Sequence, residues 1–414
     1  MEELKIKGQA AKLASAALAT AGEDIKNAAL NKIAEAFLEK YEYILAENQK
    51  DIDSARKNGI SEGLIDRLML NDARISAMAE GIRQITQLPD PIGERVNEFN
   101  RPNGLNIGEV RVPLGVVGII YEARPNVTAD AAALCIKSGN ACILRCGKEA
   151  HASSMAITLV IRQALTEAGL PADCVNLVED TNRESALALM KLNDYLDVII
   201  PRGGAGLIRS VVENATVPAI ETGTGNCHIF VDESADFEMA EKIIINAKTS
   251  RPSVCNAQEK LLVHKSVAKE FLPRILKALA EKSVEIIGDS RVCRIYPDAT
   301  PATEDDWGTE YLDLKIGVKV VDGVDDAIKH INRYGSKHSE AIVTADDANA
   351  QKFLQAIDAA AVYVNASTRF TDGFEFGFGA EIGISTQKIH ARGPMGLKAL
   401  TTTKYIIRGC GQIR

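Results

Sequence analysis

One cysteine lies in a setting that suits chemistry better than packing. Cys255 belongs to the segment NAKTSRPSVCNAQEKLLVH (246–264), in a polar, turn-forming stretch directly before a predicted strand. A thiolate at this position would be a nucleophile if nearby positive charge or N–H groups favoured its ionisation. Lys248 and Arg251 are the basic residues available in the sequence. The alternative is an inert thiol, although such thiols are more typical of apolar runs like the one around Cys135.

A carboxylate precedes this cysteine in a glycine-rich turn. Glu221 lies in the segment PAIETGTGNCHIF (218–230), at the end of a predicted strand. The pattern allows two roles, a general base or a cap of the turn. His228 beside Cys227 could suggest a metal ligand pair. No second pair follows at ligand spacing, so we expect no metal site.

Two loops have the composition of phosphate or cofactor sites. In ILRCGKEAHAS (143–153) and in VIIPRGGAGLIRS (198–210), a predicted strand opens into a basic or glycine-rich loop that leads into a helix. Glycines let a phosphate approach the backbone, and a helix N-terminus offers unpaired N–H groups. The GxGxxG pattern is absent, so tight turns without a ligand remain the alternative. The candidate residues are Arg145, Lys148, Arg202, Gly203 and Gly204.

A long polar segment late in the chain combines hydroxyl groups, an arginine and several glycines. The run VNASTRFTDGFEFGFGAEIGIST (364–386) is uncommon as a plain connection, because long loops inside a domain usually bind something. Ser367 and Arg369 suit a carboxylate or a phosphate, and Arg251 could bind the same anion. The acidic run PATEDDWGTEYLD (301–313) fits either a solvated loop or a lid.

The elements between residues 116 and 221 predict a parallel sheet covered by helices. Continuous apolar strands alternate there with helical stretches, as in sheets that are buried on both faces. The predicted strands are 116–121, 141–145, 174–178, 196–200 and 217–221, and the predicted helices are 128–138, 151–169, 183–191 and 205–213. Doubly wound sheets of this type bind ligands beyond the carboxyl ends of their strands.

The remainder of the chain predicts helices first and a second α/β domain later. Residues 1 to about 90 have apolar positions at three- and four-residue spacing, for example Ile33, Phe37 and Ile44. After about residue 225 a second alternation begins. Its predicted helices are 235–247, 266–280 and 347–356, and its predicted strands are LLVH, EAIVT and AAVYVN.

Two isolated strands complete the organisation. In residues 99–112 a turn-rich Pro-Asn-Gly is followed by alternation with a period of two, which suggests a hairpin strand. The last residues, KYIIRGCGQIR, also alternate. Such strands either pair with another subunit or form a plain sheet edge. We expect a cofactor-binding domain over 1–98 and 113–222, a catalytic domain over 223–398, and oligomerisation strands at 99–112 and 399–414.

Size and composition exclude several classes of protein. The chain has 414 residues, which is longer than a single hydrophobic core usually stabilises. A net charge of −8 argues against nucleic-acid or acidic-membrane partners. Eight scattered cysteines do not form a disulfide framework, and the charged start lacks the apolar stretch of a signal peptide. The longest apolar run is about ten residues, short of the ~18 that a membrane helix needs. We expect a cytoplasmic protein.

The motifs together resemble the aldehyde dehydrogenase superfamily and, within it, the gamma-glutamyl phosphate reductase family. They are VPLGVVGIIYEARPNVT, SGNACILRCGKEA, VIIPRGGAGLI, AIETGTGNCHIFVDESAD, SVCNAQEKLLVH and VYVNASTRFTDGFEFGFGAEIGIS. The resemblance covers essentially the whole chain. The resemblance implies an α/β fold of the aldehyde dehydrogenase type. It would have a Rossmann-type cofactor domain, a second α/β catalytic domain and a small oligomerisation hairpin.

The same resemblance assigns roles to particular residues. The family's nucleophile falls on Cys255 and the superfamily's glutamate base on Glu221. The superfamily's lysine on the adenosine side falls on Arg145, and its ribose-binding glutamate resembles Glu310. The acidic residue that meets the ribose in NAD-preferring members is replaced by Lys148. A lysine there would attract a 2′-phosphate, which favours NADPH.

One position departs from the superfamily. The asparagine whose amide helps to bind the oxyanion should fall at Arg124, and the nearest asparagine is Asn126. Either a local shift brings Asn126 into place, or this branch uses another donor. The backbone N–H of Cys255 could supply half of the oxyanion hole.

The resemblance implies reduction of L-glutamyl 5-phosphate to L-glutamate 5-semialdehyde through a cysteine thioester, in proline biosynthesis. This reaction needs no base to activate water, so Glu221 would have a weaker role than in hydrolytic relatives. The closest alternative is a hydrolytic NAD(P)-dependent aldehyde dehydrogenase. A second is a protein that keeps the fold without catalysis. Glutamate 5-kinase is a possible partner, because the acyl phosphate is labile.

Overall fold

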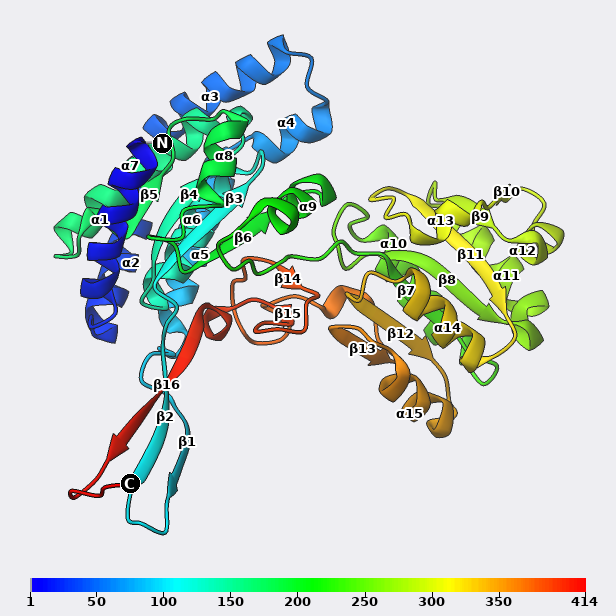
Figure 1. The fold of residues 1–414 in the computed structure, drawn as a ribbon. Helices are drawn as coiled ribbons and strands as arrows, with labels where there is room; N and C mark the ends of the chain where they lie inside the picture. The colour runs from blue at the N-terminus through cyan, green and yellow to red at the C-terminus, as the bar shows by residue number, and fades with distance from the viewer. Residues whose placement is uncertain (1) are drawn as a thin grey trace. The chain divides into compact units, whose positions relative to one another are not determined.

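The computed structural model describes residues 2–414, which form two compact units (Figure 1). The first unit contains the chain up to Thr222 together with Gly377–Gly383 and Met395–Arg414. The second unit contains Gly223–Phe376 and Ile384–Pro394. Both units are α/β structures with parallel sheets, as the sequence predicts.

Helices fill the start of the first unit. They are α1 (Glu2–Leu18), α2 (Glu23–Glu39), α3 (Tyr41–Lys57), α4 (Glu62–Leu68) and α5 (Asp72–Gln87). Ile33, Phe37 and Ile44 are at most 1% exposed, so the apolar spacing in the sequence identified the buried faces of α2 and α3 correctly.

The first parallel sheet has the strand order β5-β4-β3-β6. Its strands are β3 (Val116–Tyr121), β4 (Ala141–Arg145), β5 (Val175–Leu177) and β6 (Val198–Arg202). The helices between and after them are α6 (Pro125–Lys137), α7 (His151–Glu167), α8 (Arg183–Leu189) and α9 (Ala205–Asn214). One face of the sheet packs its apolar side chains against α1, α8 and α9, through residues such as Val116 and Ile143.

The predicted fifth strand at 217–221 is wrong. This stretch makes only a single parallel bridge, between Ile199 and Ala219. Ile199 donates its N–H to Pro218, and Ile220 donates to Ile199. Pro218 has no N–H with which to extend the ladder, so the segment does not become a strand.

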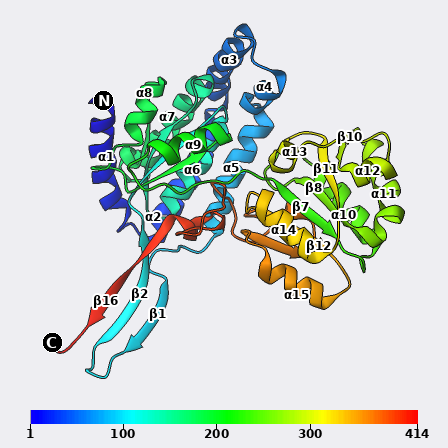
Figure 2. The same cartoon turned by 45° about the vertical axis from the view of Figure 1, so that its right-hand side comes forward.

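A three-stranded antiparallel sheet also belongs to the first unit. The predicted hairpin strand at 99–112 belongs to a hairpin of β1 (Arg95–Asn100) and β2 (Asn106–Pro113), and β16 (Thr401–Arg408) pairs along the whole of β2. The two isolated strands of the sequence therefore pair with each other. This sheet projects away from the rest of the first unit (Figures 1 and 2).

The second unit contains a seven-stranded parallel sheet of order β10-β9-β11-β8-β7-β12-β13. Its strands are β7 (Cys227–Val231), β8 (Gln258–His264), β9 (Glu285–Gly288), β10 (Thr300–Pro301), β11 (Lys315–Val321), β12 (Ser339–Val343) and β13 (Ala361–Val364). Its helices are α10 (Phe237–Thr249), α11 (Lys265–Ala280), α12 (Ser290–Ile295), α13 (Glu304–Gly308), α14 (Val324–Tyr334) and α15 (Asp347–Ala356). A short pair, β14 (Ile384–Ser385) and β15 (Gly393–Pro394), completes the unit.

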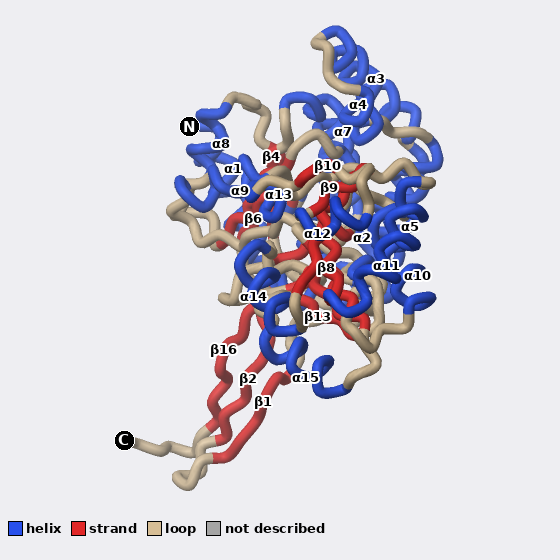
Figure 3. Tube along the Cα trace, turned by 90° about the vertical axis from the view of Figure 1, so that its right-hand side faces the viewer, coloured by secondary structure: helices blue, strands red, loops and turns tan. Residues whose placement is uncertain are grey.

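Neighbouring residues of these strands pack into two different hydrophobic cores, one on each face of the sheet. Ile229 and Leu261 pack with α10 and α11, whereas Phe230 and Leu262 pack with α14 and α15. Figure 3 shows the strands of this sheet among the helices that cover them. Within residues 2–414, no helix is long and apolar enough to span a membrane, and no group of three or more His, Cys, Asp or Glu side chains could hold a metal.

Candidate active site

The strand order of the first sheet locates a ligand crevice in the first unit. The chain runs from β3 to β4 to β5 on one side of β3, and β6 lies on the other side. Ligands of doubly wound sheets bind where the order reverses, beyond the carboxyl ends of the strands. Here that point lies after the paired residues Tyr121 and Arg202. Both predicted cofactor loops leave this edge of the sheet.

The Arg202–Gly204 loop has no room for a side chain at Gly203. A Cβ atom at Gly203 would lie 2.7 Å from the side chain of Glu122, which follows β3. Gly204 is the N-cap of α9, and its N–H donates to the Glu122 carboxylate at 3.1 Å. The helix N-terminus can therefore receive an anionic oxygen. A phosphate group at this position would have to displace Glu122.

In the other loop, side chains rather than a helix end offer positive charge. The N-terminus of α7 is capped by Asp51, whose carboxylate accepts the Ser153 N–H at 2.8 Å. The Ala152 and Ser153 N–H groups, which the sequence suggested would be unpaired, are thus both bonded to Asp51. Arg145 donates to the Thr181 carbonyl at 2.7 Å, and its buried Nε has no hydrogen-bond partner among the described residues. Lys148, the first residue of a short 3₁₀ helix, is exposed to solvent.

Asn126 is the second residue of α6, beside Arg124 at the N-cap. Its amide donates to the carboxylate of Asp130 at 3.1 Å. Burial raises the pKa of Asp130 to about 6, although the Asn126 hydrogen bond and the Arg202 charge oppose that shift. Glu221 also belongs to the first unit and is half-buried, directly after Ile220.

In the second unit, Cys255 lies in the turn between the end of α10 and the start of β8. Its side chain is half-buried. The Cys255 carbonyl accepts the thiol hydrogen of Cys227, with the sulfur 3.2 Å from the oxygen. A Cβ atom at Gly225 would lie 1.6 Å from the same carbonyl oxygen, so this position requires glycine.

The basic residues near Cys255 differ from those the sequence offered first. Lys248 is fully buried in an ion pair with Glu259, with Nζ 3.3 Å from Oε1, so its charge is neutralised there. Burial lowers the pKa of Lys248, against the attraction of Glu259. Burial also lowers the pKa of Arg369, with a further contribution from Arg251, while the charge of Cys255 opposes it. Arg369 donates to Ser250 and Asn256 on either side of the nucleophile turn, and Arg251 belongs to that turn, so these two arginines are the cations nearest to it in the structure described.

The remaining predicted residues of this unit have defined partners. Ser367 is 5% exposed and donates its hydroxyl hydrogen to Asn246 at 2.8 Å, and it also caps the 3₁₀ helix η3 (Thr368–Phe370). Glu310 accepts the Gly225 N–H at 2.7 Å, and burial raises the pKa of its carboxyl group. Glu310 thus supports the glycine that lies against Cys255.

Sequence reasoning missed Asn256 and Gly225 as site residues. Asn256 is next to the nucleophile, but its amide gave no signal apart from that position. Gly225 belongs to the glycine-rich turn noted in the sequence. Nothing in one sequence indicates which of those glycines contacts another segment.

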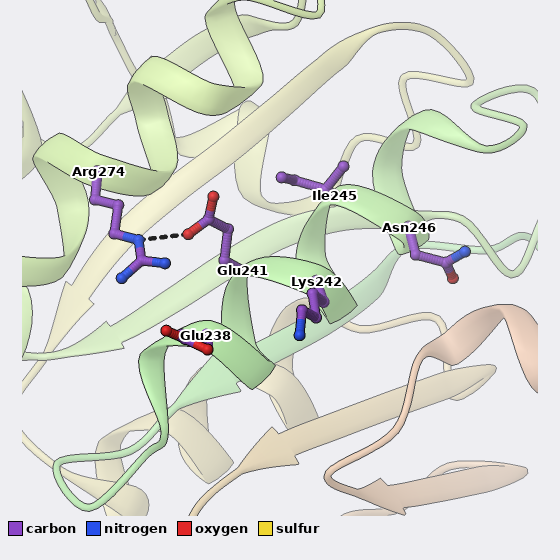
Figure 4. A pocket seen from close by; sticks show the side chains of 6 residues that line it. All are labelled: Glu238, Glu241, Lys242, Ile245, Asn246 and Arg274. Carbon is purple, nitrogen blue, oxygen red and sulfur yellow. Dashed lines mark hydrogen bonds and ion pairs between the residues drawn. The ribbon is translucent and has the colours of Figure 1, made fainter.

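A depression on the second unit is separate from these groups. It has a volume of about 390 Å³ and is lined by Glu238, Glu241, Lys242, Ile245, Asn246 and Arg274 (Figure 4). An ion pair between Arg274 and Glu241 crosses it. None of the predicted site residues lines it, so we do not assign it to the site.

A parallel sheet with a reversal point, together with a half-buried cysteine in the turn before a strand of a second parallel sheet, is the arrangement expected of an aldehyde dehydrogenase. The sequence profile of the aldehyde dehydrogenase family matches residues 4–292, and the chain belongs to this family. A structure of an engineered glycolyl-CoA reductase with bound NADP⁺ has the same fold. Its TM-score is 0.69 at 17% identity, and the match covers 97% of this chain and 96% of that one.

Within the family, the chain belongs to the gamma-glutamyl phosphate reductases. The gamma-glutamyl phosphate reductase of Clostridium botulinum is 62% identical over 414 residues, with 100% of both chains covered. The crystal structure of the Thermotoga maritima gamma-glutamyl phosphate reductase superposes with a TM-score of 0.98 at 53% identity, again over 100% of both chains. These relatives confirm the family that the sequence motifs resemble.

Proposed function

We propose that this protein reduces L-glutamyl 5-phosphate to L-glutamate 5-semialdehyde and phosphate, with NADPH, in L-proline biosynthesis. The single observation that supports this most directly is the full-length match to gamma-glutamyl phosphate reductases at 62% identity. The turn that holds Cys255 beside Arg251 and Arg369 suits the chemistry, because the substrate is an anion and the nucleophile is a thiolate.

The mechanism assigns one step to each group of the chain. The Cys255 thiolate attacks the acyl carbon, and phosphate departs to leave a thioester on the sulfur. NADPH, when bound, supplies hydride to the thioester carbon. The resulting thiohemiacetal then collapses to the aldehyde and returns the electron pair to sulfur as thiolate. We propose Arg251, Arg369 and Ser367 as the residues that hold the substrate's phosphate or carboxylate.

The oxyanion and proton-transfer groups follow from the same proposal. The Cys255 N–H and the Asn126 amide are the proposed donors to the developing oxyanion. Glu221 has a proton-transfer or thiol-activating role, because no water has to be activated. For the cofactor, the residues fit a dinucleotide phosphate that displaces Glu122 from the Gly204 N–H: Gly203 and Gly204 carry no side chains, and Arg145 and Lys148 offer positive charge. Glu310 is the proposed ribose ligand, in addition to its contact with Gly225.

Running the reaction in reverse tests the acyl-phosphate chemistry. Purified protein given glutamate 5-semialdehyde and NADP⁺ should reduce the cofactor only when inorganic phosphate is present, because phosphate must cleave the thioester. The measurement is NADPH absorbance with and without phosphate, with sulfate at equal ionic strength as the control. Phosphate-independent turnover would instead support a hydrolytic aldehyde dehydrogenase in which Glu221 activates water.

Lys148 should determine the preference for NADPH. Replacing Lys148 by glutamate should lower the affinity for NADPH by about 10- to 100-fold while changing NADH affinity little, because a 2′-phosphate would lose an attractive charge and meet a repulsive one. Fluorescence titration with each cofactor measures this without turnover. Lys191→Glu, on a different exposed segment, is the charge-matched control. Equal losses for both cofactors would contradict the assignment.

We also propose that the β1-β2-β16 sheet forms an interface between copies of the chain. Tyr405, Ile407 and Val96 expose 62%, 58% and 46% of their surfaces, which is unusual for apolar strands in a monomer. Replacing Tyr405 and Ile407 together by lysine should reduce the molar mass in light scattering to that of a monomer. The exposed pair Leu13 and Ile6, replaced in the same way, serves as the control. An unchanged mass would reject this interface.

Because the acyl phosphate is labile, we further propose that glutamate 5-kinase delivers it. We also place the protein in the cytoplasm, a reducing compartment in which Cys255 is not oxidised to a disulfide. Co-sedimentation of the two purified proteins tests direct transfer, and the absence of any shared complex would argue against it.

A further inference from the structure

Asn256, the residue after the nucleophile, has all of its side-chain polar atoms bonded to one segment. Its Nδ2 donates to the carbonyls of Arg369 at 3.2 Å and Thr371 at 2.9 Å. Its Oδ1 accepts from the Arg369 guanidinium. Its backbone carbonyl accepts the Thr368 hydroxyl at 2.8 Å. Asn256 is only 5% exposed, so these bonds form away from solvent, where losing one is costly.

The segment that Asn256 holds is itself fixed to the sheet. The Thr371 hydroxyl bonds to Ser339 at 2.6 Å and to Tyr363 at 2.7 Å, on strands β12 and β13. At the other end, Asn365 has a φ of 56°, which turns the chain back after β13, and its side chain bonds to Thr344. The 368–371 segment therefore provides a rigid support.

The cation beside the nucleophile depends on the same bonds. The Arg369 guanidinium donates to Asn256 and, through Nε, to Ser250 at 3.2 Å. Ser250 and Asn256 lie on either side of the Cys255 turn, so these two bonds hold the guanidinium at that turn.

We propose that Asn256 is a positioning residue. Its hydrogen bonds fix the Arg369 guanidinium relative to the Cys255 turn, so that the positive charge stays beside the sulfur. This role rests on the proposed function of Cys255 and adds a residue that acts through Arg369. A nearby opposite charge favours the ionised form of a group, often by roughly 10-fold or more. Releasing Arg369 should therefore reduce the thiolate fraction at neutral pH by about that factor.

The experiment is the pH profile of Cys255 alkylation by iodoacetamide, followed by peptide mass spectrometry. In Asn256→Ala the midpoint of the profile should move up by about one pH unit, with alkylation about 10-fold slower at pH 7 and kcat reduced more than KM is raised. Asn332→Ala is the matched control. Asn332 lies on α14, away from the Cys255 turn, and its side chain also joins two segments, by bonds to Ala356 and Asp358. Its profile should be unchanged.

Two further variants keep the proposal falsifiable. Thr368→Val removes only the bond to the Asn256 carbonyl and should shift the midpoint in the same direction by less, even if Asn256→Ala folds poorly. Arg369→Ala should raise the midpoint, and adding Asn256→Ala to it should change little more, because both act through one charge. Additive shifts, or an unchanged midpoint in folded Asn256→Ala, would overturn the proposal.

Alkylation requires neither acyl phosphate nor cofactor, so this test is separate from that of the proposed function. Retained reductase activity in Cys255→Ser would reject the proposed nucleophile. The alkylation profiles would still report whether Asn256 controls the charge beside that thiol.

Discussion

Replacing Cys255 by serine should lower kcat/KM for the acyl phosphate by about 10⁴-fold or more. A serine hydroxyl is intrinsically far less acidic than a thiol, so positive charge that favours a thiolate at Cys255 would still leave a serine un-ionised at neutral pH. The thioester, which makes hydride transfer possible, would no longer form. The initial rate of NADPH oxidation measures the loss.

Cofactor binding separates this result from misfolding. Fluorescence titration of NADPH should give the wild-type affinity in Cys255→Ser, because Arg145, Lys148 and the Arg202–Gly204 loop belong to the first unit, and the side-chain change leaves the Glu310–Gly225 bond of the second unit in place. Cys293→Ser is the matched control, since Cys293 is also a half-buried cysteine and lies on α12. Residual Cys255→Ser activity above about one hundredth of wild type would reject a covalent mechanism at this residue.

The second large effect is expected at Gly225. In Gly225→Ala, a Cβ atom would lie 1.6 Å from the Cys255 carbonyl oxygen and 2.5 Å from its Cα. These are backbone atoms, so no flexible side chain can move aside, and the nucleophile turn must shift. A displacement of about 1 Å at a reacting group can cost about 100-fold in rate. The Gly225 N–H bond to Glu310 would be strained by the same shift.

We therefore expect kcat to fall by about 100-fold, together with a loss of stability of about 1–3 kcal/mol from overpacking. Initial rates and thermal melting measure the two effects. Gly81→Ala, inside α5, is the control: nothing lies within 4 Å of its Cβ, and it should stabilise the protein by about 0.5–1 kcal/mol. Wild-type kcat in Gly225→Ala would show that the turn relaxes without moving the sulfur.

Local sequence patterns predicted most of the helices and strands. The buried positions of each element must be apolar, so apolar residues recur with the period of the helix or strand. The helix predicted at 347–356 is α15 with the same bounds, and the strand predicted at 116–121 is β3. The exception at 217–221 has a local cause, since Pro218 cannot donate to the ladder. The pairing of β2 with β16 was not predictable, because strand partners almost 300 residues apart are selected only when the chain folds.

The sequence by itself determined the fold class, the family and the chemical types present: a cysteine in a polar turn, basic and glycine-rich loops, and an arginine-bearing segment. Tertiary structure decided which of these groups meet. It placed Lys248 in a buried pair with Glu259, and it brought Arg369, more than one hundred residues away in sequence, to the Cys255 turn. It also gave Gly225 and Asn256 their contacts with distant segments. Residue type and spacing report what a segment can do, but charge compensation and close packing depend on distances that exist only in the folded chain.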